Sequence, residues 1–420
     1  MSTFQTALSG LQAASTDLQV MGNNIANANT VGFKSSNAQF ADAYATAIAG
    51  TAPQTGQVGI GTSVQTIAQQ FAQGNITATN NPLDVAINGS GFFQFNYNGA
   101  TVYGRNGQFQ LDQNGYLVDG GGGQLIGTPA VSGKLTGGSG PLQITATSLA
   151  PKATTSATVS LNLDAAATPP ASGTQFSFND PSTYNYSTTA TVYDSLGTPH
   201  LLTTYYVLSS GTGGSSGSGQ TWNVYYSING TTASGGTFYS DVNNPATVQF
   251  TQGGVISGSA SMVISGFTWS DGASGSTIAL NFAGSTNYNA PTAVNNITSD
   301  GYGAGQLSNL SIDPSGIIYG RYSNGQSAIL GQITLTNFKA PQGLQRIGNN
   351  YFVPTYASGQ PLTGAPQSGG LGSLQSSAVE ESNVDLSTQL VNLIVAQQAY
   401  QANAQTIKTQ NQVVQTLLTL

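Results

Sequence analysis

The residues with the clearest catalytic potential lie in the middle of the chain, at Asp194, Ser195 and His200. A carboxylate, a hydroxyl and an imidazole are the groups of a nucleophilic triad, in which the imidazole must reach both oxygens. However, the stretch VYDSLGTPH (192–200) is typical of a strand, a turn and a second strand. Six residues of turn do not by themselves place the three groups. We therefore interpret this stretch as a hairpin and expect no catalytic site in it.

Other short motifs match ligand sites only in part. The glycines at 120–123 lack the Gly-Lys-Ser/Thr of a phosphate-binding loop and a helix after it, so we interpret them as a turn. Asp112 and Asn114 match the start of a calcium loop, but the later acidic ligands are missing. Asp241 and Asp271 lie in expected loops without a partner pattern, so a pair of glycosidase carboxylates has no support.

The composition excludes several classes of function. Charged residues are 5% of the 420 residues, against roughly 25% in ordinary soluble domains. No Lys or Arg occurs between Lys152 and Arg321, so we expect no surface for nucleic acid or anionic lipid. With no Cys and one His, disulfides and thiolate chemistry are excluded, and the softest metal ligand is missing. We expect no enzyme activity, no cofactor and no metal site.

The sequence also bears on targeting. No apolar run approaches the roughly 20 residues of a membrane span, so no membrane insertion is expected. The N-terminus has no basic region followed by an unbroken apolar core, and therefore does not match a Sec-type signal peptide. If the protein leaves the cell, we expect a route that does not cleave its start.

The elements that organise the chain are two helices at its ends. From 386 to 418 apolar residues recur in steps of four and three, the spacing that keeps one stripe on one face of a coiled coil. The first 27 residues carry the same spacing. The predicted seams contain Phe4, Leu8, Leu11, Leu18, Ile25, Leu386, Leu390, Leu393, Tyr400, Ile407, Val414 and Leu418. We expect the two helices to pair. An ordinary amphipathic core helix remains the alternative for the first one.

Between the helices, short strand-like runs alternate with turns. NPLDVAINGSGFFQF (81–95) contains two such runs, and 109–117 has a hairpin pattern that recurs at 310–318. We infer one β-domain built from two separated pieces, with a second all-β domain inserted between them. The predicted fold is multidomain α+β. It has a terminal helical domain (1–30 plus 379–420), a partly extended connector (31–75) and a discontinuous inner β-domain (76–148 plus 296–378). The outer domain (149–295) is an inserted antiparallel β-barrel or sandwich, whose strands are separated by Gly/Ser loops such as 209–220.

Both ends of the chain resemble a known family. The opening ALSGLQAASTDLQVMGNNIANANTVGFK (7–34) resembles the N-terminal signature of the bacterial flagellar axial proteins, which are the rod, hook and hook-associated subunits. The ending ESNVDLSTQLVNLIVAQQAYQANAQTIKT (381–409) resembles their C-terminal signature. Within these segments the motif residues are Asn27, Asn29, Thr30, Gly32, Phe33, Lys34, Asn383 and Asp385. VYDSLGTPH and NPLDVAINGSGFFQF are similar to segments of the hook members of this family in particular.

The resemblance implies a structural subunit that polymerises with copies of itself. It implies a curved, flexible, hollow tube that transmits torque from rod to filament as a universal joint. The implied partners are rod subunits proximally, hook–filament junction proteins and a hook cap distally, and the flagellar type III export apparatus. The implied location is extracellular, reached without a cleaved signal peptide. Gln397 and Asn411 interrupt the seam, and they either fix its register or face the export channel.

Two other interpretations remain open from the sequence. One is a distal rod subunit of the basal body, which would be rigid; the large inserted β-domain argues against it, because the distal rod member is shorter. The other is a secreted β-rich adhesin or glycan-acting enzyme, for which the sequence offers no cleft residues. One departure from the family is also visible, since spirochaete hook proteins crosslink through a Cys and this chain has none.

Overall fold

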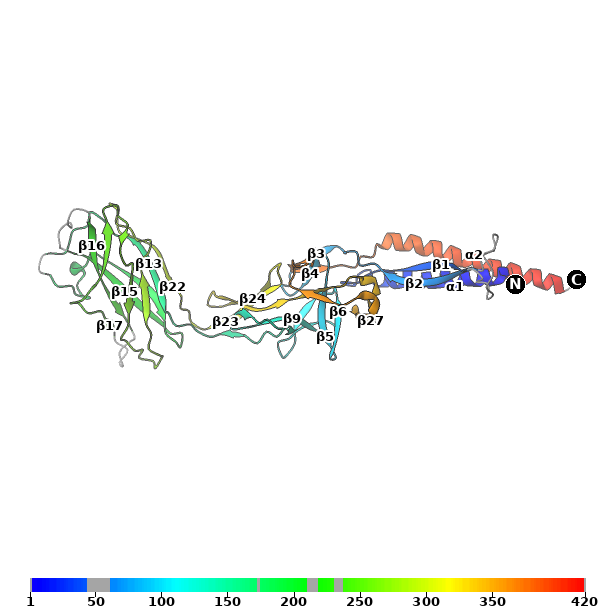
Figure 1. The fold of residues 1–420 in the computed structure, drawn as a ribbon, viewed down its shortest axis with the longest axis horizontal. Coiled ribbons are helices and arrows are strands. Elements are labelled where there is room, and N and C mark those ends of the chain that lie inside the picture. The colour runs from blue at the N-terminus through cyan, green and yellow to red at the C-terminus, as the bar shows by residue number, and fades with distance from the viewer. Residues whose placement is uncertain (1, 44–60, 172–173, 210–217, 230–236, 419–420) are drawn as a thin grey trace. The chain divides into compact units, whose positions relative to one another are not determined.

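The computed structural model describes residues 2–43, 61–171, 174–209, 218–229 and 237–418. It is mostly β, with one long helix at each end, α1 (Ser2–Ala26) and α2 (Leu386–Leu418) (Figure 1). This mostly β architecture with two terminal helices confirms the coarse prediction from the sequence. Within the described residues, neither helix is both long enough and apolar enough to cross a membrane.

The chain divides into two compact units. The helix-bearing unit comprises Met1–Ala146, Asn309–Arg321 and Ser327–Leu420, and the inserted unit comprises Thr147–Ser308 and Tyr322–Gln326. The sequence analysis placed the inserted domain at 149–295, so the compact unit extends further at its C-terminal side. Most of the Gly/Ser loop 209–220 lies outside the described residues.

The two terminal helices pack against each other. They approach closely at Gly10, where an added Cβ would lie 2.8 Å from Oδ1 of Asn403. The chain leaves α1 through a turn that requires glycine at position 32. Gly32 has a φ of 70°, and a Cβ there would lie 2.5 Å from the backbone nitrogen of Asn106. The turn therefore brings the chain after α1 against the β-sheet of the same unit.

Two strands follow this turn and form an antiparallel ribbon, β1 (Ser36–Ala43) with β2 (Gly61–Gln69). Both strands pack on α1. The sequence predicted a partly extended connector over 31–75, and it did not predict that its strands pair with each other and cover α1. Residues 44–60 of that connector lie outside the described residues.

The largest sheet has 15 strands among the described residues. Most of its strands belong to the helix-bearing unit, whereas β12 and parts of β23 and β24 belong to the inserted unit. Its strands are β5 (Phe92–Tyr97), β6 (Ala100–Gly104), β7 (Phe109–Leu111), β8 (Leu117–Asp119), β9 (Gln124–Val131), β10 (Lys134–Leu135), β11 (Gly140–Pro141), β12 (Ser148–Leu149), β23 (Gly305–Ile312), β24 (Ile317–Tyr322), β25 (Ser327–Ile333), β26 (Leu335–Asn337), β27 (Gln345–Gly348), β28 (Tyr351–Val353) and β29 (Leu362–Gly364). Two further pairs are β3 (Ile76–Ala78) with β31 (Ala378–Glu380), and β4 (Val85–Asn88) with β30 (Ser373–Ser376). These pairs join segments from both ends of the sequence.

The two similar hairpin patterns fold in the same way. Asp112 follows β7, and its Oδ1 accepts hydrogen bonds from the backbone N–H groups of Asn114 and Tyr116 at 2.8 Å each. Asp313 follows β23, and its Oδ1 accepts from Ser315 and Ile317 at 2.9 Å each. The aspartate caps its own turn in both cases, so the partial match of Asp112 to a calcium loop is explained by turn geometry.

The inserted unit contains two sheets around one apolar core. The larger sheet has β14 (Tyr186–Tyr193), β15 (Pro199–Leu208), β16 (Ser218–Ile228), β17 (Phe238–Tyr239), β18 (Ala246–Thr251) and β19 (Ile256–Ser257), and the smaller has β13 (Ser156–Asn162), β20 (Ser261–Ile264), β21 (Ile278–Asn281) and β22 (Ala293–Ser299). The core includes Leu161 of the smaller sheet and Trp222 of the larger. The prediction of a wholly antiparallel domain is wrong in one ladder, because β13 pairs with β21 in parallel. The chain runs through the larger sheet between these two strands, so no hairpin sets their direction.

Candidate functional site

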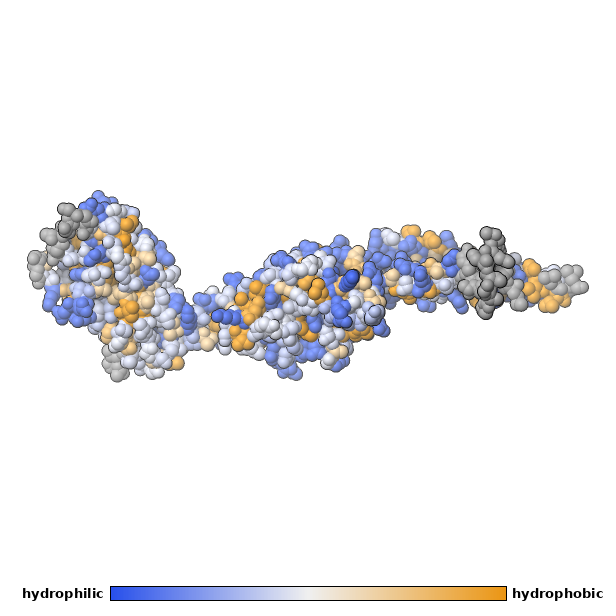
Figure 2. All heavy atoms as spheres, viewed as in Figure 1, coloured by the Kyte–Doolittle hydropathy of each residue, from blue (hydrophilic) through white to orange (hydrophobic). Residues whose placement is uncertain are grey.

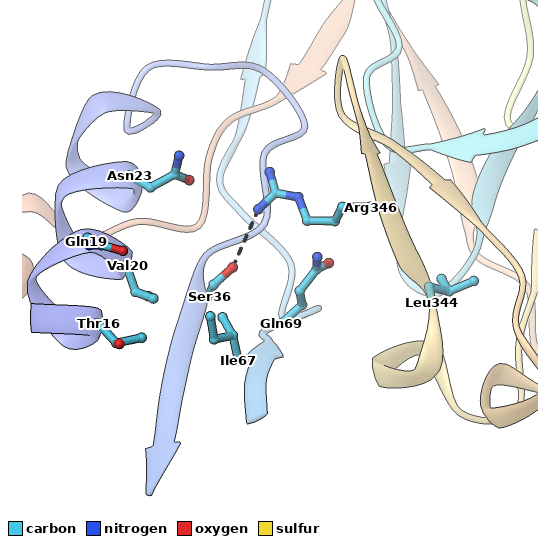
Figure 3. A pocket seen from close by; sticks show the side chains of 9 residues that line it. All are labelled: Thr16, Gln19, Val20, Asn23, Ser36, Ile67, Gln69, Leu344 and Arg346. Atoms are coloured by element: carbon cyan, nitrogen blue, oxygen red, sulfur yellow. Dashed lines mark hydrogen bonds between the residues drawn. The ribbon is translucent and has the colours of Figure 1, made fainter. Parts of the chain in front are cut away.

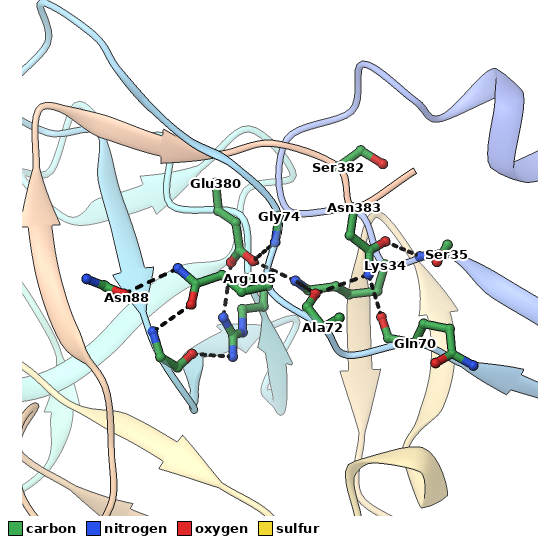
Figure 4. Close-up of polar contacts among 12 residues, drawn as sticks. Lys34, Ser35, Gln70, Ala72, Gly74, Asn88, Arg105, Glu380, Ser382 and Asn383 are labelled. Atoms are coloured by element: carbon green, nitrogen blue, oxygen red, sulfur yellow. Dashed lines mark hydrogen bonds and ion pairs between the residues drawn. The ribbon is translucent and has the colours of Figure 1, made fainter. Parts of the chain in front are cut away.

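The two ends of the chain meet at a buried cluster of three charged side chains. Nζ of Lys34 lies 2.6 Å from Oε1 of Glu380, and Nη1 of Arg105 lies 3.1 Å from Oε2 of the same carboxylate (Figure 4). The side chains of Lys34 and Glu380 are fully buried. Lys34 follows α1, Arg105 follows β6, and Glu380 ends β31. One carboxylate therefore joins three segments that are distant in the sequence.

Three backbone groups also form hydrogen bonds with this cluster. Lys34 Nζ donates to the carbonyl of Ala72 at 2.8 Å, and Arg105 Nη2 donates to the carbonyl of Gly89 at 2.9 Å. Oε1 of Glu380 also accepts the N–H of Gly74 at 2.9 Å. Burial lowers the pKa of the Lys34 ammonium, although the nearby carboxylate of Glu380 acts in the opposite direction. The cluster is thus a set of buried ion pairs that holds the three segments together.

Two asparagines add hydrogen bonds beside the buried cluster, on the side of the terminal helices. Asn383 accepts the N–H of Ser35 at 2.8 Å and donates to the carbonyl of Gln70 at 2.7 Å (Figure 4). Asn24, near the end of α1, is buried; it accepts the N–H of Ser36 at 2.9 Å and donates to its carbonyl at 2.8 Å. Together they fix the chain where β1 begins and where β2 ends.

The structure places the predicted motif residues in different roles. Gly32 donates its N–H to the carbonyl of Glu380 at 2.8 Å, so Gly32, Lys34 and Asn383 all belong to the junction of the two ends. Phe33 is buried under the guanidinium of Arg346, which lies 4.9 Å from its ring centroid. Thr30 Oγ1 donates to Oδ1 of Asn27 at 3.1 Å inside the turn after α1. Asn29 is exposed.

Asp385, the remaining motif residue, caps the start of α2. Its Oδ1 accepts the backbone N–H groups of Ser387 at 2.9 Å and Thr388 at 3.2 Å. The backbone hydrogen bond from Thr388 is the main cause that lowers the pKa of this carboxyl, and the hydroxyl of Thr388 adds to it. The cap therefore holds as a carboxylate at neutral pH and fixes where α2 begins.

Small residues account for most of the buried apolar side chains of the two terminal helices. The buried apolar residues of α1 are Ala7, Ala13, Ala14 and Val20, and Ala396 alone is buried among the described side chains of α2. The predicted seam residues are less buried in the monomer: Leu11, Leu18, Ile25, Leu393 and Ile407 are half-buried, and Phe4, Leu8, Leu386, Leu390, Tyr400, Val414 and Leu418 are exposed. At Gly10, where there is no side chain, the helices approach closely against Asn403.

A groove of about 430 Å³ lies beside the junction, between α1, the β1–β2 ribbon and the segment 344–346 (Figure 3). It is lined by Thr16, Gln19, Val20, Asn23, Ser36, Ile67, Gln69, Leu344 and Arg346. Arg346 is the one ionisable group among these nine residues, and its Nη1 donates to Oγ of Ser36 at 3.5 Å. A single cation without an acid or base partner gives this groove no means of proton transfer.

The candidate triad of the inserted unit does not assemble as a triad. Nε2 of His200 lies 2.9 Å from Oδ2 of Asp194, but Oγ of Ser195 accepts the N–H of Ser274 at 2.9 Å. β14 ends at Tyr193 and β15 begins at Pro199, which confirms the predicted strand, turn and strand. Burial works to raise the pKa of Asp194, yet hydrogen bonds, that from His200 foremost, lower it to about 2.

Comparisons with known proteins agree with the resemblance of the two ends. Four family models match the chain: "Flagella basal body rod protein" at 4–34, "Flagellar hook protein FlgE/F/G D1 domain" at 86–162, "Flagellar basal body protein FlaE D2 domain" at 162–302 and "Flagellar basal body rod FlgEFG protein C-terminal" at 375–420. The flagellar hook protein FlgE of Salmonella typhimurium is 41% identical over 426 residues, covering 100% of both chains. The chain belongs to the flagellar hook protein family.

Other hook proteins extend this finding. The flagellar hook protein FlgE of Escherichia coli K12 is 40% identical over 431 residues, covering 99% of each chain. The crystal structure of the Helicobacter pylori flagellar hook protein FlgE2 has the same fold, with a TM-score of 0.54 and 16% identity over 71% of this chain and 99% of that one. In this hook-family chain, Lys34, Arg105 and Glu380 lie in three separately matched regions, so the buried cluster is where those regions are tied together.

Sequence reasoning found Lys34 and missed both of its charged partners. Arg105 is a single charged residue in ordinary loop sequence, and Glu380 ends a short strand directly before Glu381. A signal was nevertheless present, because a chain with 5% charged residues rarely places a charge next to apolar strand residues without a partner. Asn24 gave no such signal, because Asn is common throughout this chain.

Proposed function

We propose that this chain is a structural subunit of the bacterial flagellar hook. It assembles with copies of itself into a curved, flexible, hollow tube that transmits motor torque from the rod to the filament, and it has no enzymatic activity. The observation that carries this proposal is the similarity to hook proteins over the whole chain. The same similarity favours the hook over the distal rod and over an adhesin.

The exposed apolar residues of the terminal helices support assembly through these helices. Leu390, Val391, Ile394 and Val395 are each 50–60% exposed, and Figure 2 shows apolar surface on the terminal helices. Burying a side chain of this size contributes about 1.5–3 kcal/mol before the entropy of ordering is subtracted. A helix with so much uncovered apolar surface needs partners. We infer that neighbouring copies supply them, and that the predicted seams become coiled-coil contacts lining the export channel.

The proposed surroundings follow from membership in the hook family. We infer that rod subunits bind at the proximal end of the tube, and that junction proteins and a cap bind at the distal end. We also infer that the flagellar type III apparatus exports the chain without cleavage, which places the mature subunit outside the cell.

Bending of the tube requires contacts that shift during each rotation. We infer that the inserted unit provides them, because it contains a single basic residue, Lys152, and many Gly, Ser and Thr residues, so its contacts with neighbours are polar and hydrated. The helices stay engaged while the inserted units slide past each other. The connector from 28 to 75 absorbs the remaining change in spacing.

Polymerisation of the purified full-length chain tests this function. We expect curved tubes in electron micrographs, whereas straight tubes indicate a rod subunit. A monomer that never assembles but binds glycans indicates an adhesin. The double variant Leu390→Gln with Ile394→Gln removes two exposed apolar residues from α2. It should fold like the parent and raise the critical concentration at least about tenfold, because each side chain is already about half covered in the monomer and the pair loses about 1.5–3 kcal/mol of further burial.

The matched control for this experiment is Gln401→Ala with Gln405→Ala. Both glutamines are exposed on the same helix, and their replacement adds no charge and removes no apolar surface. This control should polymerise at the parent's critical concentration. If the variant with Leu390→Gln and Ile394→Gln also polymerised at the parent's critical concentration, α2 would not form the contacts of the tube.

A further inference from the structure

A second cluster of polar side chains lies in the inserted unit and takes no part in the proposed assembly. Asp194, His200 and Asp271 each offer one donor atom, and these three atoms all lie within 4.8 Å of one another. Asp194 and His200 flank the turn between β14 and β15, and Asp271 lies in the loop between β20 and β21. The cluster therefore joins the larger sheet of this unit to the smaller one.

Local structure fixes the direction of each donor. Oδ1 of Asp194 accepts the turn N–H groups of Leu196 at 2.8 Å and Thr198 at 2.9 Å, which leaves Oδ2 toward His200. Trp269 stacks on the imidazole of His200, with the ring centroids 4.1 Å apart and an angle of 26°. These contacts hold the carboxylate and the imidazole before any ligand arrives.

The loop that carries Asp271 is held against the same turn. Oδ2 of Asp271 accepts the hydroxyl of Thr198 at 3.0 Å, and Oδ1 accepts the N–H of Ala273 at 3.1 Å. Asp271 is exposed, whereas Asp194 and His200 are buried. The cluster thus has two buried donor atoms, from Asp194 and His200, and one donor atom at the surface, from Asp271. An ion and a coordinating water would reach the cluster from the side of Asp271.

The charge around this cluster is not balanced by any basic side chain of the unit. The sequence of the inserted unit contains one Lys and no Arg, against six Asp at 164, 180, 194, 241, 271 and 300. The lysine, Lys152, is paired with Asp300 at 3.0 Å. Two carboxylates near each other, one of them buried, repel unless a positive charge offsets them. A bound cation is one source of that positive charge.

We propose that Asp194, His200 and Asp271 bind a divalent transition metal ion, with Zn²⁺ as the best match. One imidazole nitrogen and two carboxylate oxygens form a three-ligand set of the kind Zn²⁺ takes, with water in the remaining position. Two ligands that are each about 2.0–2.1 Å from one ion lie roughly 3.3 Å apart at a tetrahedral angle. His200 Nε2 and Asp194 Oδ2 are 2.9 Å apart, so a small outward shift brings them to this spacing. The all-oxygen sites that Ca²⁺ and Mg²⁺ prefer fit less well.

The earlier expectation of no metal site rested on the absence of Cys and on the single His. A site with two carboxylates needs neither a thiolate nor a second imidazole. The contribution of Asp271 was not visible in the sequence, because it lies 71 positions after His200. Bound at this position, the ion clamps the β14–β15 turn to the β20–β21 loop and stiffens the contact between the two sheets.

The test uses the full-length monomer, freed of metal with a chelator and then titrated with ZnCl₂ alone. We expect one Zn²⁺ per chain by equilibrium dialysis, a rise in Tm, and a change in tryptophan fluorescence because Trp269 contacts His200. CaCl₂ and MgCl₂ at the same concentration should not bind, and they should leave the Tm and the tryptophan fluorescence unchanged.

The deciding variant is Asp271→Asn. The residue is exposed, and the one carbonyl oxygen of Asn can still accept the N–H of Ala273 while its Nδ2 donates to the hydroxyl oxygen of Thr198, so folding should be preserved. We expect it to weaken Zn²⁺ binding at least tenfold, and His200→Gln to weaken it further. The control Asp241→Asn changes an exposed turn aspartate of the same unit and should bind Zn²⁺ like the parent. No binding at millimolar Zn²⁺, or equal binding by Asp271→Asn and the parent, overturns the proposal.

Discussion

At the scale of single residues, Glu380 has the largest structural consequence. Its carboxylate pairs with Lys34 and Arg105, and it also accepts a backbone N–H from Gly74. A buried carboxylate between two cations is tolerated because each charge has a partner within about 3 Å, and removing one member leaves the others unpaired. The three residues come from the start, the middle and the end of the chain, so the stability of the junction depends on all three segments at once.

Glu380→Gln should therefore destabilise the monomer strongly. The substitution keeps the size of the side chain but leaves Lys34 and Arg105 as two buried cations without a counter-charge. We expect a loss of about 3–5 kcal/mol in the free energy of unfolding, measured by urea denaturation. The neighbouring Glu381→Gln is the control, because Glu381 is exposed and its loss should cost no more than about 0.5 kcal/mol. Equal stability of the two variants would contradict the role given to the cluster.

The pH dependence of the Glu380→Gln variant follows from Lys34. Burial lowers the pKa of this lysine in the folded state from its ordinary value of 10.5, and loss of the carboxylate removes the main opposing effect. Between the lowered pKa and 10.5 the unfolded chain binds a proton that the folded chain does not bind. The free energy of unfolding of the variant should therefore increase as the pH rises toward 10.5, more steeply than that of the parent.

At the scale of elements, the pairing of α1 with α2 depends on small residues. Gly10 lies against the side chain of Asn403, and a Cβ there would be 2.8 Å from its Oδ1 and 3.0 Å from its Nδ2. Gly22 lies on the same helix, and a Cβ at that position would meet nothing within 4 Å. These two glycines thus separate the effect of helix packing from that of helix propensity.

Gly10→Leu should loosen the helix pair, and Gly22→Leu should not. Both substitutions gain up to about 1 kcal/mol of helix propensity. At position 10 the added side chain must displace Asn403 or push the helices apart, at a cost of about 1–3 kcal/mol. We expect Gly22→Leu to be the more stable variant when the helical CD signal at 222 nm is followed in urea. The opposite order, or no difference, would show that α1 and α2 do not pack at Gly10.

The elements also show which parts of the fold follow from local sequence. The steps of four and three predicted both helices, and turn aspartates such as Asp112 predicted the hairpins, because these signals act over fewer than ten residues. The close approach of α1 to α2 at Gly10 and Asn403 was not predicted, because the expected seams followed large apolar residues. The parallel pairing of β13 with β21 and the approach of Asp271 to His200 depend on long-range topology, which periodicity does not encode.

At the scale of the whole molecule, the chain leaves the helix-bearing unit and returns to it along a paired ladder. β12 and β23 are antiparallel, and Leu149 lies opposite Gly305 in their register. The sequence predicted the end of the insertion near 295, before the end of the inserted unit. This boundary was hard to place because both units consist of similar short strands and no change in composition marks the passage from β22 to β23. The ladder locates a cleaner point at which the inserted unit can be removed.

Replacing residues 150–304 with Asn-Gly should leave a chain that folds and polymerises. Leu149 and Gly305 are already paired, so a two-residue turn of this type closes the ladder as a hairpin. The terminal helices and the buried cluster at Glu380 are untouched. We expect tubes whose curvature or stiffness differs from the parent's, measured from their contours in electron micrographs. Adding Leu390→Gln with Ile394→Gln to the deletion should abolish these tubes. A deleted chain that keeps its helical CD signal yet never polymerises would show that the inserted unit, and not α2, supplies the contacts on which assembly depends.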